Sequence, residues 1–389
     1  MIIKANDSLK LEDYSKRYNL PLLTIILANN LKSNRNMPTY IKIPGYSMRQ
    51  IANPYDISIV SKELLPEVLR INQVNTIEQL QRKVNIFIPH KEDQYVYYEQ
   101  PYTYNVLCHD QQRLIDLYPF IQKHSIGYSV CGKEINELTI GSGPKKLHIN
   151  AAMHGNEWIT AAILMNFFNE YAFAITNPEH IWHSYMMKSF KNVTLSIVPM
   201  VNPDGVDLAI NGSNTLPERS FDLVKINKGR TDFSNWKANI RGVDLNKQFP
   251  ALWDIEASRF NQIPAARDYS GSEPLTEPEA KALVQLVKDR NFHRVISLHT
   301  QGEEIYWHFG KNIPAESKYI SEEFARVSGY QNVKHLDNYA GFKDWFIQEY
   351  NRPGFTIELG RGVNPLSLEK FTNIYMKVKR ILLANLYIK

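Results

Sequence analysis

The sequence has little cysteine, no strong excess of charge and no evident export signal, and each shortage excludes a class of protein. The 389 residues contain two cysteines, Cys108 and Cys131, whose spacing fits neither a CxxC redox pair nor a zinc ribbon. We therefore expect two buried thiols rather than a disulfide. The net charge of +5 is spread along the chain, so it does not indicate a nucleic-acid partner.

No apolar run in the sequence is expected to reach the length of a membrane span, so we expect no membrane-spanning helix and no membrane partner. The first residues, MIIKANDSLK, lack the basic, apolar and small-residue regions of a secretory signal. A chain of 389 residues is too long for one ordinary core and suits two or three domains.

Residues 1–90 contain a degenerate repeat. The endings IKIP and IFIP recur at Ile41–Pro44 and Ile86–Pro89, a period of about 45 residues. Each copy has apolar residues at helical spacing and closes with an alternating strand and a proline. The pattern predicts two small units of strand, helix, helix and strand.

Residues 1–45 resemble a LysM module, the small domain that binds N-acetylglucosamine chains of peptidoglycan or chitin. The resemblance runs along nearly all of IIKANDSLKLEDYSKRYNLPLLTIILANNL. Residues 46–90 are a degenerate LysM-like copy, because YSMRQIANPYD lacks the helix-capping turn of the family. The resemblance implies glycan binding by the first module and leaves sugar binding by the second open. A helical dimerisation module is the alternative.

Residues 91–103 are polar and aromatic without a clear period, so we predict a linker. From residue 104 to 389, apolar runs such as KKLHINAAM, VTLSIVPM and RVISLHT alternate with helix-like stretches such as EWITAAILMNFFNEYA. The alternation predicts an α/β sheet covered on both faces, with ligands gathered beyond the C-terminal strand ends. Four polar residues stand at such ends: His154, Asn202, His299 and Glu358.

Two histidines and one glutamate are a common ligand set for catalytic zinc, which keeps its fourth position for water. His154 and Glu157 are three residues apart at the start of a helix, and His299 ends another strand. The spacing His-x-x-Glu is weak by itself. The strand before it, the turn at Gly155 and the helix after it support one zinc ion per chain, bound by these three residues.

Six segments in order give residues 104–389 a specific resemblance to the zinc carboxypeptidases of the carboxypeptidase A superfamily: HGNEW, NPDGVD, RGVDLNKQFP, SLHTQGEEIYW, NYAGFKDW and TIELG. The resemblance implies a mixed, mostly parallel sheet flanked by helices, the same three zinc ligands, and Glu358 as general base toward a zinc-activated water. It also implies Tyr339 as the substrate-loop tyrosine. Either Lys237 or Arg241 is then the basic residue that stabilises the oxyanion.

One segment departs from this family. Ordinary carboxypeptidases clamp the substrate's C-terminal carboxylate with Asn-Arg, whereas here Asn246 is followed by Lys247. Lysine lacks the planar fork of arginine, so we do not expect strict recognition of a normal C-terminus. Lys343 falls where related enzymes set the charge of the specificity pocket, which indicates an anionic substrate group. Glu303 either recognises a substrate amine or is an ordinary carboxylate paired with Arg or Lys.

LysM-like modules joined to such a peptidase resemble the bacterial γ-D-glutamyl-L-diamino acid endopeptidases, which cut the γ-D-glutamyl-meso-diaminopimelate bond of peptidoglycan stem peptides. The resemblance implies that Lys247, Lys343 and Arg361 meet carboxylates of the substrate. A carboxypeptidase that trims peptide C-termini and a non-catalytic wall-binding protein are the alternatives. We expect a location in the cytoplasm, or in association with the spore and its mother cell.

Overall fold

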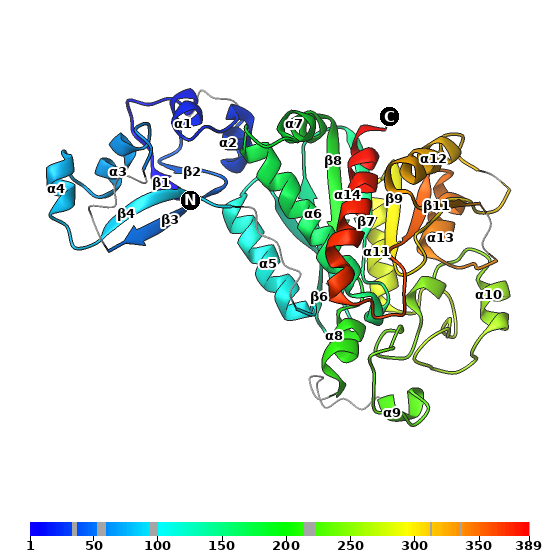
Figure 1. Ribbon diagram of the computed structural model, residues 1–389. Helices are drawn as coiled ribbons and strands as arrows, with labels where there is room; N and C mark the ends of the chain where they lie inside the picture. The colour runs from blue at the N-terminus through cyan, green and yellow to red at the C-terminus, as the bar shows by residue number, and fades with distance from the viewer. Residues whose placement is uncertain are drawn as a thin grey trace. The chain divides into compact units, whose positions relative to one another are not determined.

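The computed structural model describes residues 1–32, 37–52, 60–93, 100–213, 222–311, 313–334 and 337–388. Its contacts divide the chain into two compact units (Figure 1). Unit 1 consists of Met1–Tyr95, Asp110–Gln122 and Asn169–Phe190, and unit 2 of Val96–His109, Lys123–Phe168 and Lys191–Lys389. Residues 94–99 of the expected linker lie outside the described residues. The boundaries expected after residues 45, 90 and 103 stay predictions.

Unit 1 contains two successive repeats, each closed by an antiparallel pair of strands. The first consists of β1 (Ile2–Lys4), α1 (Leu11–Arg17), α2 (Leu22–Ala28) and β2 (Tyr40–Lys42). The second consists of β3 (Tyr46–Ile51), α3 (Leu65–Ile71), α4 (Ile77–Gln81) and β4 (Ile86–Lys91). Both have the order strand, helix, helix, strand that the sequence repeat predicts.

One asparagine makes the same contacts in each repeat. Asn29, which follows α2, accepts a hydrogen bond from Lys42 N at 2.8 Å and returns one to Lys42 O at 2.9 Å. Asn72, which follows α3, accepts from Phe87 N at 2.8 Å and returns one to Phe87 O at 2.7 Å. The same side chain therefore ties a helix to the closing strand in both repeats, which makes α3 the counterpart of α2 and supports a common origin for the two repeats.

Unit 2 is built on an eight-stranded sheet in the order β11-β10-β12-β9-β7-β8-β6-β5. The strands are β5 (Gln122–Tyr128), β6 (Glu134–Ile140), β7 (Lys145–Asn150), β8 (Val193–Val198), β9 (Arg294–His299), β10 (Glu304–Tyr306), β11 (Gln331–Val333) and β12 (Gly354–Glu358). The central strands β12, β9, β7 and β8 are parallel, whereas β6 and β10 pair antiparallel with β8 and β12. This confirms the expected mixed, mostly parallel sheet.

Helices cover both faces of the sheet. The helices that follow the repeats are α5 (Tyr104–Leu117), α6 (Ile159–Thr176), α7 (His183–Asn192), α8 (Pro203–Asn211), α9 (Leu223–Ile226), α10 (Trp253–Arg259), α11 (Pro278–Arg290), α12 (Ser317–Ser328), α13 (Phe342–Tyr350) and α14 (Phe371–Tyr387). Val295 of β9 packs in one apolar cluster with residues of α11 and α13. The next residue back, Arg294, donates to Asn385 Oδ1 of α14 at 3.1 Å. Because neighbouring strand residues point to opposite faces, α14 lies opposite α11 and α13.

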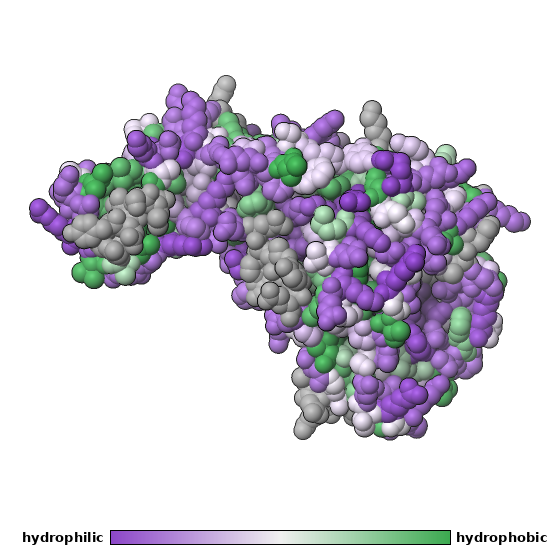
Figure 2. Space-filling model, viewed as in Figure 1, coloured by the Kyte–Doolittle hydropathy of each residue, from purple (hydrophilic) through white to green (hydrophobic). Residues whose placement is uncertain are grey.

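One apolar stretch, Gly155–Thr176, is long and apolar enough to cross a membrane, so the expectation that no run reaches that length is wrong. This stretch is 94% buried inside the protein. Its composition is explained by packing on all sides in a protein core. The face drawn in Figure 2 shows apolar side chains scattered among hydrophilic ones rather than gathered in a band.

Cys108 and Cys131 are free thiols, as the sequence predicts, but both are partly exposed rather than buried. Burial, followed by the charge of Asp204, raises the pKa of Cys131 to about 12. Only the thiolate is a strong nucleophile, so Cys131 is not a cysteine nucleophile at neutral pH.

Candidate metal centre

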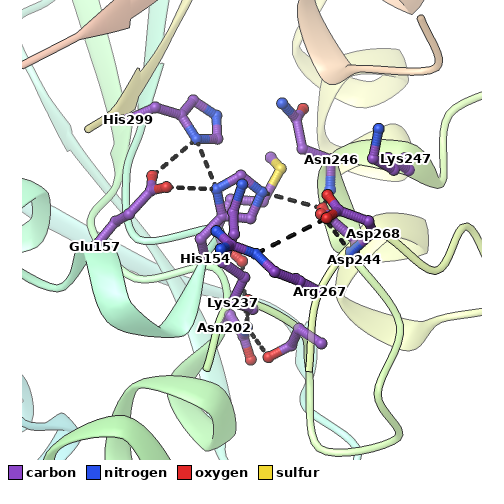
Figure 3. Close-up of polar contacts among 12 residues, drawn as sticks. His154, Glu157, Asn202, Lys237, Asp244, Asn246, Lys247, Arg267, Asp268 and His299 are labelled. Atoms are coloured by element: carbon purple, nitrogen blue, oxygen red, sulfur yellow. Dashed lines mark hydrogen bonds and ion pairs between the residues drawn. The ribbon is translucent and has the colours of Figure 1, made fainter. Parts of the chain in front are cut away.

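The three predicted zinc ligands come together at the C-terminal edge of the central strands (Figure 3). His154 follows β7, Glu157 lies in the short 3-10 helix η2 (Gly155–Glu157), and His299 ends β9. Their ligand atoms all lie within 4.8 Å of one another, and all three side chains are buried. Glu157 reaches both rings, with Oε1 2.8 Å from His154 Nδ1 and Oε2 3.0 Å from His299 Nδ1.

A buried aspartate orients the first histidine. Asp244 Oδ1 lies 3.0 Å from His154 Nε2. Burial alone would raise the pKa of Asp244, but His154 and Lys237 hold it well below its usual range. An ionised Asp244 accepts the Nε2 proton, so Nδ1 is the His154 ring atom that faces the other ligands and can bind a metal ion.

A row of hydrogen bonds orients the second histidine. Ser297 donates its hydroxyl to Asn150 Oδ1 at 2.6 Å, because an amide oxygen can only accept. The same hydroxyl oxygen, 3.2 Å from His299 Nε2, therefore accepts the ring proton. The row continues from Asn150 Nδ2 to His148 Nε2 at 3.5 Å. His299 Nδ1 is thus a bare lone pair directed at the centre.

The resulting donor set fits zinc. The Nδ1 atoms of His154 and His299 lie 3.2 Å apart, and the carboxylate of Glu157 faces both. A cation held between the two ring nitrogens and the carboxylate would satisfy all three buried groups at once. Two imidazoles and one carboxylate are the ligands of a catalytic zinc with an open fourth position.

Close backbone packing holds the ligand loop. Gly155 N donates to Lys237 O at 3.0 Å, and a Cβ added at Gly155 would lie 2.4 Å from Gly205 O. Asn202, the N-cap of α8, donates from its side chain to Met153 O at 3.2 Å. Only glycine fits at residue 155, and Asn202 supports the loop instead of facing a ligand.

Glu358, the expected general base, stands next to the metal ligands. It ends β12, and the parallel pairing of β12 with β9 sets Glu358 directly beside His299. Burial, followed by repulsion from Glu157, raises the pKa of Glu358 to about 8. A cation held by the neighbouring ligands opposes that rise. The position suits a carboxylate that accepts and returns a proton.

The structure separates the two basic residues expected to serve the oxyanion. The ammonium of Lys237 interacts electrostatically with Asp244, Glu157 and Glu358, and these charges raise its pKa although burial opposes them. Arg241 is directed elsewhere: its Nη1 lies 3.5 Å from Glu277 Oε2, and 46% of its side chain is exposed. Lys237 is therefore the residue of the two that lies in the centre.

The lysines expected to bind substrate carboxylates already have carboxylate partners. Lys247 is buried, pairs with Glu256 and donates to Asn338 Oδ1 at 3.2 Å. Lys343 is also buried, pairs with Asp344 and donates to the backbone carbonyl of His308 at 2.9 Å. Neither lysine offers the uncompensated charge that the sequence suggested.

The other expected substrate residues also contact protein groups. Glu303 lies 2.6 Å from Lys377 Nζ and 3.2 Å from Arg361 Nε, which is the ordinary paired carboxylate of the two interpretations. Tyr339 donates its hydroxyl to Asp337 Oδ1 at 2.9 Å. Asn246 Oδ1 accepts from the backbone of α13 at 3.1 Å. All three side chains therefore have protein partners in this conformation.

Two residues near the centre, Arg267 and Asp268, are not predicted from the sequence motifs. Asp268 N donates to Asp244 Oδ2 at 3.4 Å, and Arg267 Nε lies 3.8 Å from Asp268 Oδ2 (Figure 3). The preceding residue, Ala266, accepts a backbone hydrogen bond from Lys237 N at 2.9 Å. No local pattern marks these positions, because contacts between distant segments bring them to the site.

The comparisons with known proteins agree with this geometry. Residues 108–375 match the family of zinc carboxypeptidases. The chain is 48% identical over 290 residues to γ-D-glutamyl-L-diamino acid endopeptidase 1 of Lysinibacillus sphaericus, which covers 75% of this chain and 73% of the relative. It is 41% identical over 319 residues to the uncharacterized protein YqgT of Bacillus subtilis (strain 168), a match that covers 81% of this chain and 85% of the relative.

Solved structures share the fold. Bovine thrombin-activatable fibrinolysis inhibitor has a TM-score of 0.57 at 20% identity and covers 75% of this chain and 97% of its own. The carboxypeptidase A of Helicoverpa armigera has a TM-score of 0.56 at 14% identity, and the match covers 88% of this chain and 97% of that structure. At these identities the likeness shows the fold alone.

Proposed function

Because the chain belongs to the zinc carboxypeptidase family, we propose that it hydrolyses the bond between γ-D-glutamate and meso-diaminopimelate in peptidoglycan stem peptides. The observation that carries the chemistry is the buried acceptor set of His154, Glu157 and His299 with Glu358 beside it. The substrate class is supported by the 48% identity to a relative named for γ-D-glutamyl-L-diamino acid cleavage.

The residues of the centre divide the work of amide hydrolysis. His154, Glu157 and His299 would hold zinc, which when bound polarises the scissile carbonyl and makes water more acidic. Glu358 accepts a proton from the attacking water and returns it to the nitrogen of the leaving diamino acid. Lys237 donates to the carbonyl oxygen as negative charge develops on it. The products are a free γ-carboxylate on D-glutamate and a free amine.

An ordinary carboxypeptidase activity is disfavoured by the clamp segment. In the structure, Lys247 is buried against Glu256, so it does not present a free cation to a C-terminal carboxylate. A peptidase that lacks this clamp has no strong handle on a normal C-terminus. Endopeptidase cleavage next to a γ-linked residue needs no such handle.

The repeats of unit 1 are proposed to be LysM-like modules that bind N-acetylglucosamine chains. Support comes from the strand, helix, helix, strand order and from the shared roles of Asn29 and Asn72. The role in cell-wall turnover or sporulation, and a location in the cytoplasm or with the spore and mother cell, rest on the same resemblance. Sedimentation of the full chain with insoluble peptidoglycan, competed by soluble N-acetylglucosamine oligomers, tests the module. Binding that the oligomers fail to compete would oppose it.

The activity is tested by mass spectrometry. Zinc-loaded protein is incubated with L-Ala-γ-D-Glu-meso-diaminopimelate, and we expect release of L-Ala-D-Glu by the wild type and not by Glu358→Gln. Glu349→Gln, at an exposed position of α13, is the matched control and keeps activity. An intact tripeptide, together with removal of C-terminal residues from ordinary peptides, would move the enzyme to the carboxypeptidase class.

A further inference from the structure

A γ-D-glutamyl bond leaves the α-carboxylate of the D-glutamate free, a few bonds from the carbonyl that is cut. An enzyme specific for this bond needs a cation for that carboxylate, because desolvating an unpaired charge is costly. The cations expected for this role already have partners in the protein. The pairs are Lys247 with Glu256, Lys343 with Asp344, and Arg361 with Glu303.

A second group of cations surrounds a hollow of about 510 Å³ in unit 2. Its wall includes Lys228, Arg230 and Arg267, together with the amides of Asn235 and Asn261. No carboxylate belongs to the wall among the residues that the structure describes. Three cations around one concave surface raise the local concentration of anions.

Backbone contacts join this hollow to the catalytic centre. Ala266, in its wall, accepts a hydrogen bond from Lys237 N at 2.9 Å, and Lys237 interacts with Glu157. The next residue, Arg267, is held by Asn261, whose Nδ2 donates to Arg267 O at 2.8 Å. The main chain of Arg267 is thus tied to the segment that carries Lys237.

The guanidinium of Arg267 is more exposed and less tightly paired than the ammonium groups of Lys247 and Lys343. Its side chain is 56% exposed, and its ion-pair contact is Asp268 at 3.8 Å, beyond hydrogen-bond length. Lys247 and Lys343, by contrast, are buried with direct carboxylate partners. Arg267 can therefore turn toward a ligand without leaving a buried carboxylate unpaired.

We propose that this hollow is a carboxylate-binding subsite on the acyl side of the scissile bond, where Arg267 binds the α-carboxylate of the γ-D-glutamyl residue. The inference rests on the function proposed above. The planar fork of arginine matches a carboxylate with two parallel hydrogen bonds. Lys228 and Arg230 add positive potential behind it, which favours an anionic acyl group over a neutral one.

Two substrates that differ in a single group test the proposal. One is L-Ala-γ-D-Glu-meso-diaminopimelate, and the other carries D-isoglutamine, whose neutral amide replaces the α-carboxylate. We expect the wild type to prefer the carboxylate, mainly through KM. Arg267→Gln should lower kcat/KM for the carboxylate substrate about 10- to 100-fold and change the amide substrate by less than about threefold. Arg267→Lys should restore part of the preference, because it keeps the charge and loses the fork.

The control is Arg380→Gln on α14, an exposed arginine outside the hollow, which should keep the wild-type preference. An equal loss on both substrates in Arg267→Gln, or an unchanged preference, would overturn the subsite.

Binding separates this question from catalysis. Calorimetry with the zinc-loaded Glu358→Gln variant measures Kd for both tripeptides, with and without Arg267→Gln. If the wild type cleaves neither tripeptide, the proposed function is wrong, and the calorimetry still tests the subsite. An equal Kd for the carboxylate and amide tripeptides would overturn the subsite.

Discussion

Replacing Ser297 with alanine should weaken zinc binding although Ser297 is not a ligand. Its hydroxyl donates to Asn150 and accepts the Nε2 proton of His299. In the alanine variant the Nε2 proton of His299 has lost its acceptor. The tautomer protonated on Nδ1 is then favoured, because Glu157 Oε2, 3.0 Å away, accepts that proton. Zinc must then displace this proton. Groups that orient a ligand in this way contribute about 10- to 100-fold in metal affinity, or about 1.4–2.7 kcal/mol.

The matched control is Ser328→Ala at the end of α12. Ser328 is also buried, and its Oγ likewise donates one hydrogen bond, to Phe324 O at 2.7 Å, and accepts one, from Tyr330 N at 3.0 Å, with no metal ligand among its partners. Each substitution removes a buried hydrogen bond, so each should lower the free energy of unfolding of the zinc-free protein by about 1 kcal/mol. Only Ser297→Ala should also lose zinc affinity.

Competition with a chromogenic chelator measures the zinc affinity, and urea denaturation measures the stability. The absorption spectrum of the cobalt-substituted protein reports whether the ligand geometry has changed. Zinc affinity of Ser297→Ala within about twofold of wild type would refute the assigned proton positions, against the loss expected for a group that orients a ligand. An equal loss in Ser328→Ala would show that general loosening of the protein is responsible.

Three further outcomes are expected. Burial raises the pKa of Glu279 to about 7 from its usual 4.5. Between about pH 4.5 and pH 7 the folded protein therefore keeps a proton on Glu279 that the unfolded chain has released. The contribution of this group to the free energy of unfolding is complete below about pH 4.5 and falls by roughly 3 kcal/mol by about pH 7. Glu279→Gln should abolish this slope in urea titrations at about pH 5 and pH 8; an unchanged slope contradicts it. Gly155→Ala sets a Cβ 2.4 Å from Gly205 O and should cost about 1–3 kcal/mol in thermal unfolding of the zinc-free protein; an unchanged Tm would show that the loop yields freely. Lys237→Met should lower kcat about 100-fold with little change in KM, whereas Arg241→Met should leave steady-state kinetics unaltered; the reverse result would exchange their roles.

The sequence by itself determined the features that depend on local spacing. His154 and Glu157 are recognised because three residues separate them at a strand-to-helix turn, and His299 because it closes an apolar run. The α/β architecture follows from alternating periodicity, and the repeat follows from its two IxIP endings. The structure keeps all of these, because short-range pattern and backbone geometry are directly linked.

Only the tertiary structure decided which charges are free and which stretches are buried. The sequence predicts that Lys247 and Lys343 bind carboxylates of the substrate. In the structure the charge of Lys247 is paired with Glu256 and that of Lys343 with Asp344. The apolar stretch 155–176 has the composition of a membrane span and lies in a protein core. Charge pairing and burial depend on which distant segments approach each other, and one-dimensional spacing does not record that approach. For the same reason Arg267 carried no motif, although backbone contacts tie its segment to that of Lys237.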